Sequence, residues 1–356
     1  MLLRNDTPLA AIGFDDLHRD GAVMAVVAVR ASYALTAEGA LRLYERQAIA
    51  MSDVYAGDPH RTPLLRANDL VGYRPHADVT VLGSAHAPGG RPAASWDVSL
   101  GLGNGRTDLR VHGPRRWEPD GASWRLGPAE PVARVPLDYR LSAGGRFVGD
   151  PEGGGSRYNP IGPGLLHRDW SPAGRALRAP QIEAVDAPVT DPFAVPEPAG
   201  FGPVPPFWAW RERRCGTRDE AWQRGRCPQM PADFDYRFFQ VAPPRLVVRR
   251  LTGGTRVSLD GLLPTGPLGF QLPAFVPVVR HSWNDGREAR AALTLDGLHL
   301  DLRAEAPPWS VDLTWRGWIA RCPAYLGAEL DAVPAGQAAG LPVSGEHGLR
   351  DGGEAA

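Results

Sequence analysis

The sequence contains no lysine, and all 39 of its basic residues are arginines. A Schiff-base lysine, the phosphate-binding lysine of a P-loop and a kinase-type lysine are therefore excluded together. Cysteine is nearly as scarce, with three residues in a chain of 356. This small, odd number argues against a disulfide framework, and we expect the protein to work in a reducing compartment.

Net charge and long apolar runs are lacking as well. The arginines are balanced by 40 acidic residues, which leaves a formal net charge of -1 and no overall attraction for nucleic acid or an anionic membrane. The longest apolar run, residues 22–29, is far shorter than the ~20 residues of a membrane-spanning helix. Residues 1–10 include polar residues where a signal peptide is apolar. We therefore expect a cytoplasmic protein with no nucleic-acid or membrane partner.

Glycine and proline, by contrast, are abundant, at 42 and 36 residues, and both disfavour long helices. The valine-rich run 22–29 predicts a strand that is buried on both faces. Asn104-Gly105 and Asp296-Gly297 each lie between alternating apolar residues, which predicts two tight hairpins. The expected fold class is mainly β, with two antiparallel β-sandwich-like regions and few short helices.

The length suits about two domains. We expect an N-terminal β domain over residues 1–145, a C-terminal β region over 236–332 that packs with it, and a disordered tail over 333–356. The connecting segment 146–235 is rich in proline, glycine, tryptophan and arginine, and we expect irregular but ordered structure there. Residues 218–224 and 323–332 are the two candidate short helices. The sequence leaves open whether the two β regions share one sheet system.

Catalytic signatures are sparse. The chain has no G-x-S-x-G, H-E-x-x-H, G-x-G-x-x-G or C-x-x-C motif. Cys215 lies among arginines and is the candidate nucleophile, although an arginine-rich loop more often forms ion pairs with carboxylates. Cys227 would complete a zinc site with Cys215 only if a closely spaced ligand pair were present, and none is. We expect no metal and no cofactor.

Three histidines near predicted strands are the raw material of a hydrolase or metal site: His76, His86 and His112. The possible carboxylate partners are Asp69, Asp78 and Asp97. The other interpretation is that each histidine only forms hydrogen bonds beside its own turn. Trp208 and Trp210 are likewise open to three uses, namely core packing, sugar stacking or anchoring a protein interface.

Ordered motifs along the chain carry a family resemblance. They include NDTPLAAIGF, VVAVRASYAL, VHGPRRW, NPIGPG, PAGFGPVPPFWAWRERRCGTRDEAW and CPQMPADFDYRFFQVAPP. With them, the chain over roughly residues 5 to 320 resembles the bacterial family called domain of unknown function 2169. This chain has Arg74 where the family usually has lysine, and Arg218 where it has tyrosine. Arginine cannot replace lysine in proton transfer, whereas such a change on a binding surface would alter the choice of partner.

The resemblance implies a non-enzymatic adaptor or chaperone, which binds a type VI secretion effector and helps to load it onto a VgrG spike tipped by a PAAR-repeat protein. Tryptophan and arginine are the side chains that most often anchor such contacts. The candidate partner-binding residues are Trp208, Trp210, Arg211, Arg213 and Trp222, with Asp69, Arg74 and Asp78 in the N-terminal half. Replacing Trp208 and Trp210 by alanine is expected to leave the fold intact and abolish effector binding. The alternatives are a hydrolase that uses His76, His86 and His112, and a secreted structural component of the spike.

Overall fold

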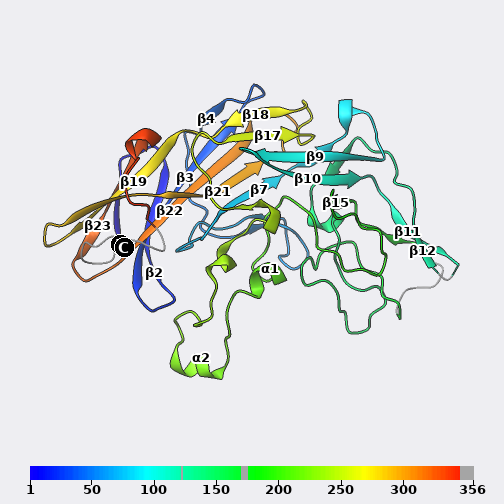
Figure 1. The fold of residues 1–356 in the computed structure, drawn as a ribbon, viewed down its shortest axis with the longest axis horizontal. Coiled ribbons are helices and arrows are strands. Elements are labelled where there is room, and N and C mark those ends of the chain that lie inside the picture. The colour runs from blue at the N-terminus through cyan, green and yellow to red at the C-terminus, as the bar shows by residue number, and fades with distance from the viewer. Residues whose placement is uncertain (122, 170–174, 345–356) are drawn as a thin grey trace.

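The computed structural model describes residues 1–121, 123–169 and 175–344. Strands dominate it, and its two α-helices are short, α1 (Ala209–Glu212) and α2 (Glu220–Gly225) (Figure 1). The predicted mainly β fold class is therefore confirmed. No helix in these ranges is long and apolar enough to cross a membrane.

A seven-stranded sheet forms the centre of the molecule. In spatial order its strands are β16 (Val247–Val248), β7 (Ala77–Leu82), β21 (Thr294–Asp301), β22 (Trp309–Ala320), β3 (Val23–Leu35) and β2 (Ala10–Leu17), and β4 (Leu41–Leu43) also pairs with β3. β3 is buried on both faces from Met24 to Ala31, as its valine-rich sequence predicts. It pairs with β22 along almost its whole length. The two predicted β regions thus share one sheet, which answers the question that the sequence leaves open.

A five-stranded antiparallel sheet packs against the central sheet. Its order is β15 (Ile182–Ala184), β10 (Gly105–His112), β9 (Ser95–Leu102), β17 (Arg256–Asp260) and β18 (Leu268–Gln271). The hairpin predicted at Asn104-Gly105 does join β9 to β10, but its turn lies one residue earlier, because Gly105 pairs with Leu102 and the positive φ belongs to Gly103. Side chains of both sheets belong to one apolar core, among them Val79, Val81, Val98, Leu100, Val257 and Leu300.

The third sheet holds the N-terminal strand. Its order is β1 (Leu2–Asn5), β23 (Tyr325–Pro334), β19 (Phe275–Trp283) and β20 (Glu288–Ala292). The helix predicted over residues 323–332 is wrong, because this segment is β23 and pairs with β19 along its length. β1 runs parallel to β23, and β7 runs parallel to β21, so the sheets are not all antiparallel.

The connecting segment contains little regular structure. The remaining short strands precede it in the chain, except for β14 (Leu177–Arg178), which is inside it. β5 (Val54–Tyr55) pairs with β6 (Leu64–Arg66), β8 (Ser84–His86) with β13 (Arg134–Pro136), and β11 (Arg116–Asp120) with both β12 (Ser123–Leu126) and β14. The 3₁₀ turns are η1 (Pro88–Gly90), η2 (Tyr139–Leu141), η3 (Tyr236–Phe239), η4 (Pro244–Leu246) and η5 (Ala335–Gln337). The helix predicted over residues 218–224 corresponds to α2.

Two further expectations differ from the structure. The hairpin turn predicted at Asp296-Gly297 is wrong, because both residues lie inside β21, where the register shifts at a β-bulge. In the predicted disordered tail, β23 continues to Pro334, η5 follows, and Val343 pairs with Ala292. The rest of that tail, residues 345–356, lies outside the described residues.

Candidate functional site

One face of the central sheet carries charged residues, and it is buried. Arg30 on β3 and Asp312 on β22 face the same side, with 2.5 Å between Arg30 Nη2 and Asp312 Oδ2. Further along, Arg316 on β22 forms an ion pair with Asp296 on β21. Burial acts to raise the pKa of Asp312, but the Arg30 guanidinium and a hydrogen bond from Ser32 lower it. The sheet therefore presents a permanent network of buried ion pairs.

Asp69, one of the predicted partner-binding residues, also belongs to this network. Its carboxylate accepts a hydrogen bond from Arg30 Nη1 at 3.0 Å and another from the backbone N–H of Ala50 at 2.8 Å. Its backbone carbonyl accepts from Arg316 Nη2 at 3.0 Å. Asp69 thus fixes the segment before β7 to the sheet and is itself buried.

Asp78 holds a second covering segment in place. Its carboxylate accepts hydrogen bonds from Gln240 Nε2 at 2.8 Å, Val241 N at 2.9 Å and Ala242 N at 3.1 Å. Arg74 Nη1 lies 3.7 Å from Asp78 Oδ2. Asp78 is 2% exposed and Arg74 is 8% exposed. The structure brings the three predicted N-terminal residues together, but inside the protein, where they cannot contact a partner directly.

A cavity of about 40 Å³ lies within this network, lined in part by Arg30, Asp69, Arg74 and His299. Its size suits about one water molecule. Burial lowers the pKa of His299 to about 4, so this imidazole is neutral, and its Nδ1 lies 2.9 Å from Thr80 Oγ1. The alternating polar positions of β21 and β22 are visible in the sequence, but alternation alone predicts a solvated face. For that reason sequence reasoning missed His299, Asp312 and Arg316. It also missed Asp296, which the Asp-Gly signal placed in a turn, and Arg30, which follows the apolar run 22–29.

Three more predicted residues, all within the connecting segment, are buried, and we call them the root. Trp208 is 0% exposed, and its ring meets that of Tyr139 edge-on at 5.1 Å. Trp210 is also buried, and its Nε1 donates to Glu197 Oε1 at 2.9 Å. Arg211 donates to the backbone carbonyls of Val204 and Phe238. Replacing both tryptophans would open large cavities, so the expectation that the fold survives this double substitution does not fit their burial.

The last two predicted residues, Arg213 and Trp222, lie on an arm, which we define as residues 213–230. The arm projects from the sheets with α2 at its end (Figure 1), and none of its residues is buried. Asp219 caps α2 by accepting from Trp222 N at 2.8 Å, and Trp222 Nε1 donates to Gln229 O at 2.8 Å. The arm is thus locally ordered, although it contributes little to the core.

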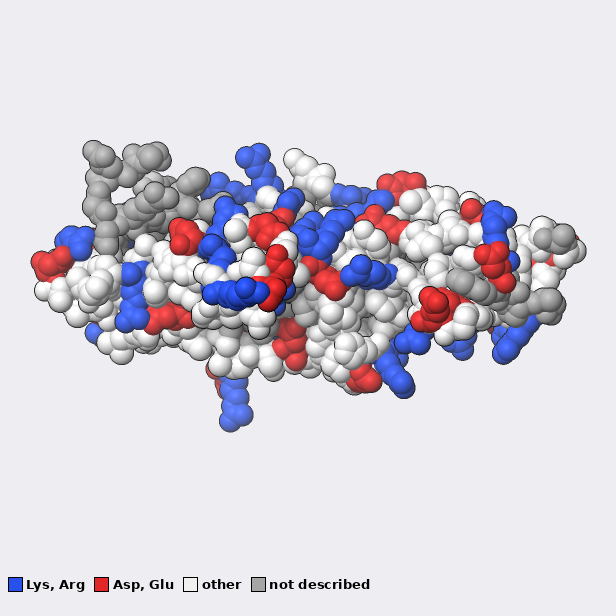
Figure 2. All heavy atoms as spheres, turned by 90° about the horizontal axis from the view of Figure 1, so that it is seen from below, with Lys and Arg blue, Asp and Glu red and all other residues white. Residues whose placement is uncertain are grey.

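The arm contacts the rest of the protein through Arg226, which directly follows α2. Arg226 donates to the backbone carbonyl of Arg19 in the turn between β2 and β3. Nearer the root, Asp233 accepts hydrogen bonds from both the backbone and the hydroxyl of Thr217. These contacts fix where the arm points. On the face in Figure 2, arginines and carboxylates are interspersed, as the balanced composition requires.

The three predicted histidines have different surroundings. His112 Nε2 lies 2.8 Å from Glu183, a carboxylate that Arg115 also contacts, whereas His86 pairs through its backbone with Arg134. The backbone N–H of His76 donates to Gln240. Among residues 1–121, 123–169 and 175–344, no group of three or more His, Cys, Asp or Glu side chains could hold a metal ion. Cys215 and Cys227, both on the arm, are free thiols.

These features define a mainly β protein with a buried ionic network and one projecting arm. A family model described as "Uncharacterized protein conserved in bacteria (DUF2169)" matches residues 20–316, and the chain belongs to this family. Comparisons with curated proteins and with solved structures gave no match.

Proposed function

We propose that the protein is a non-enzymatic adaptor, which binds a type VI secretion effector in the cytoplasm and helps to load it onto the spike of VgrG and a PAAR-repeat protein. Membership of the bacterial family and the motifs that it shares support this proposal. The structural observation that carries it is the arm, which projects from the sheets and places Trp222 and Arg218 outside the core.

The chemistry of the arm suits recognition of an acidic protein surface. Arg213 and Arg218 are exposed, and Arg218 lies over the ring of Trp222, with 5.7 Å from its Cζ to the ring centroid. A half-buried indole beside exposed guanidinium groups can fill a shallow pocket while the guanidinium groups pair with carboxylates. The rigid root at Trp208 and Arg211 reduces the conformational entropy that the arm loses on binding.

The test is co-expression of the tagged protein with the effector candidate and the spike components encoded nearest to its gene. The wild type should retain the effector on an affinity column. The double variant Arg218→Glu/Trp222→Ala should lose it, because one substitution reverses a charge and the other removes the anchor. A matched control, Arg91→Glu/Met51→Ala, makes the same kinds of change at exposed sites off the arm.

Equal retention by both double variants would contradict the role of the arm. No retention of any neighbouring effector by the wild type would contradict the adaptor function itself. Release of the protein into the culture supernatant together with the spike would favour the alternative of a secreted structural component.

A further inference from the structure

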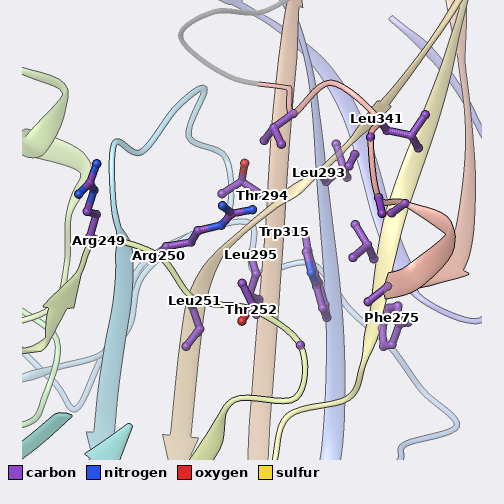
Figure 3. Close-up of a pocket in the computed structure, with 18 residues that line it drawn as sticks. Arg249, Arg250, Leu251, Thr252, Phe275, Leu293, Thr294, Leu295, Trp315 and Leu341 are labelled. Carbon is purple, nitrogen blue, oxygen red and sulfur yellow. The ribbon is translucent and has the colours of Figure 1, made fainter. Parts of the chain in front are cut away.

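A cavity of about 570 Å³ opens between the central sheet and the four-stranded sheet (Figure 3). Its floor is apolar and is formed by Leu295 on β21, Trp315 on β22 and Leu293, which directly precedes β21. All three side chains are buried. Phe275 on β19 and Leu341 after η5 form half-buried walls. The volume lies within the range of about 300–1,000 Å³ that is usual for ligand sites.

Positive charge borders this apolar space. Arg249 and Arg250 lie at its edge, both exposed, and the side chain of Arg250 points toward Thr294 and Trp315 in Figure 3. No ion pair joins either arginine to a residue in the described part of the chain, and none of the described residues that line the cavity is a carboxylate. Other exposed arginines of this protein do have carboxylate partners, such as Arg110 with Asp97. The cavity is therefore complementary to a ligand that is both apolar and acidic.

The backbone beside the cavity already accepts an extended chain. β20 is an edge strand of its sheet, and its last residue, Ala292, lines the cavity. Ala292 N donates to Pro342 O at 3.0 Å, and Ser344 N donates to Ala292 O at 3.0 Å. The segment around Val343 thus pairs with Ala292 in parallel. Both outward backbone groups of Ala292 are thus taken by the chain's own segment, which shows that an extended segment fits beside the cavity.

We propose that this cavity binds an extended segment of a partner protein in which apolar and acidic residues alternate. Apolar side chains enter the space above Trp315, and carboxylates where the segment crosses the rim pair with Arg249 and Arg250. This proposal depends on the proposed function in one respect, namely that the partner protein is the effector. Binding of the segment itself can be tested without an effector.

The probe is a short fluorescein-labelled peptide that alternates leucine with glutamate, followed by fluorescence anisotropy. The wild type should bind it saturably, and Arg249→Glu/Arg250→Glu should bind at least about tenfold more weakly. Arg46→Glu/Arg91→Glu is the matched control, because both residues are exposed and lie away from the cavity. A peptide with lysine in place of glutamate should bind the wild type at least about tenfold more weakly. The wall variant Leu341→Asp should also weaken binding, because it places a carboxylate beside the apolar floor.

The outcomes separate this proposal from the proposed function. No saturable binding by the wild type, or equal binding by the two double arginine variants, overturns the cavity proposal, even if the effector still co-purifies through the arm. Selective binding of the leucine–glutamate peptide with no effector on the column supports the cavity proposal and contradicts the adaptor function. Displacement of the effector by excess peptide supports both.

Discussion

Replacing Asp78 by alanine should strongly destabilise the protein. The substitution leaves three buried N–H donors, on Gln240, Val241 and Ala242, without their acceptor, and it leaves Arg74 buried without its nearest counter-charge. Each unpaired buried donor costs about 1–3 kcal/mol, but local relaxation recovers part of this sum. Breaking a buried ion pair by removing one partner costs about 3–5 kcal/mol, and we expect a loss of that size. It would be a large part of a total stability of about 5–15 kcal/mol.

Urea unfolding followed by tryptophan fluorescence measures this loss. The control is Asp6→Ala, because Asp6 pairs with Arg4 at 2.9 Å but both side chains are well exposed, so its removal should cost less than about 1 kcal/mol. Equal midpoints for the two variants would refute the assignment of Asp78 to the internal structure. The isosteric Asp78→Asn variant, studied where it is folded, should bind the effector as the wild type does.

Three further predictions concern the root, the arm and pH. Trp208→Ala should lower the free energy of unfolding by about 3–5 kcal/mol, and an unchanged urea midpoint would contradict its place in the core. Arg218→Glu/Trp222→Ala should change stability by less than about 1 kcal/mol, and a larger loss in the same assay would show that the arm supports the fold. Burial lowers the pKa of His281 and His299 from 6.5 to about 4, so as pH falls from about 6.5 toward 4 the unfolded chain binds protons that the folded protein does not, and stability decreases. His281→Gln should reduce the difference between urea midpoints at pH 7 and pH 5, and an equal difference would contradict this cause.

The features that the sequence predicts correctly are local. The valine-rich run at residues 22–29 is too short for a membrane-spanning helix and too apolar for a half-exposed strand. It therefore predicts a strand that is buried on both faces. The hairpin between β9 and β10 is predicted as well, although the positive φ of its turn belongs to Gly103 and not to Gly105. Both follow from a few neighbouring residues, and the distant contacts of this fold agree with that local preference.

The features that depend on distant contacts were not predictable in the same way. Tyr325–Pro334 has no strong local preference, and pairing with β19 and β1 makes it a strand. The Asp-Gly pair at 296–297 is a turn signal, but Asp296 is buried against Arg316 and the strand continues through it. Trp208 and Trp222 look alike in the sequence, although one fills the core and the other lies on the arm.

Titration calorimetry of the purified protein with its purified effector candidate tests the central claim most directly. The adaptor account predicts a saturable complex with a defined stoichiometry, weakened at least about tenfold by Arg218→Glu/Trp222→Ala and unchanged by Arg91→Glu/Met51→Ala. Heat from substrate turnover that disappears on His86→Ala, with no saturable complex, would contradict the account and favour an enzyme.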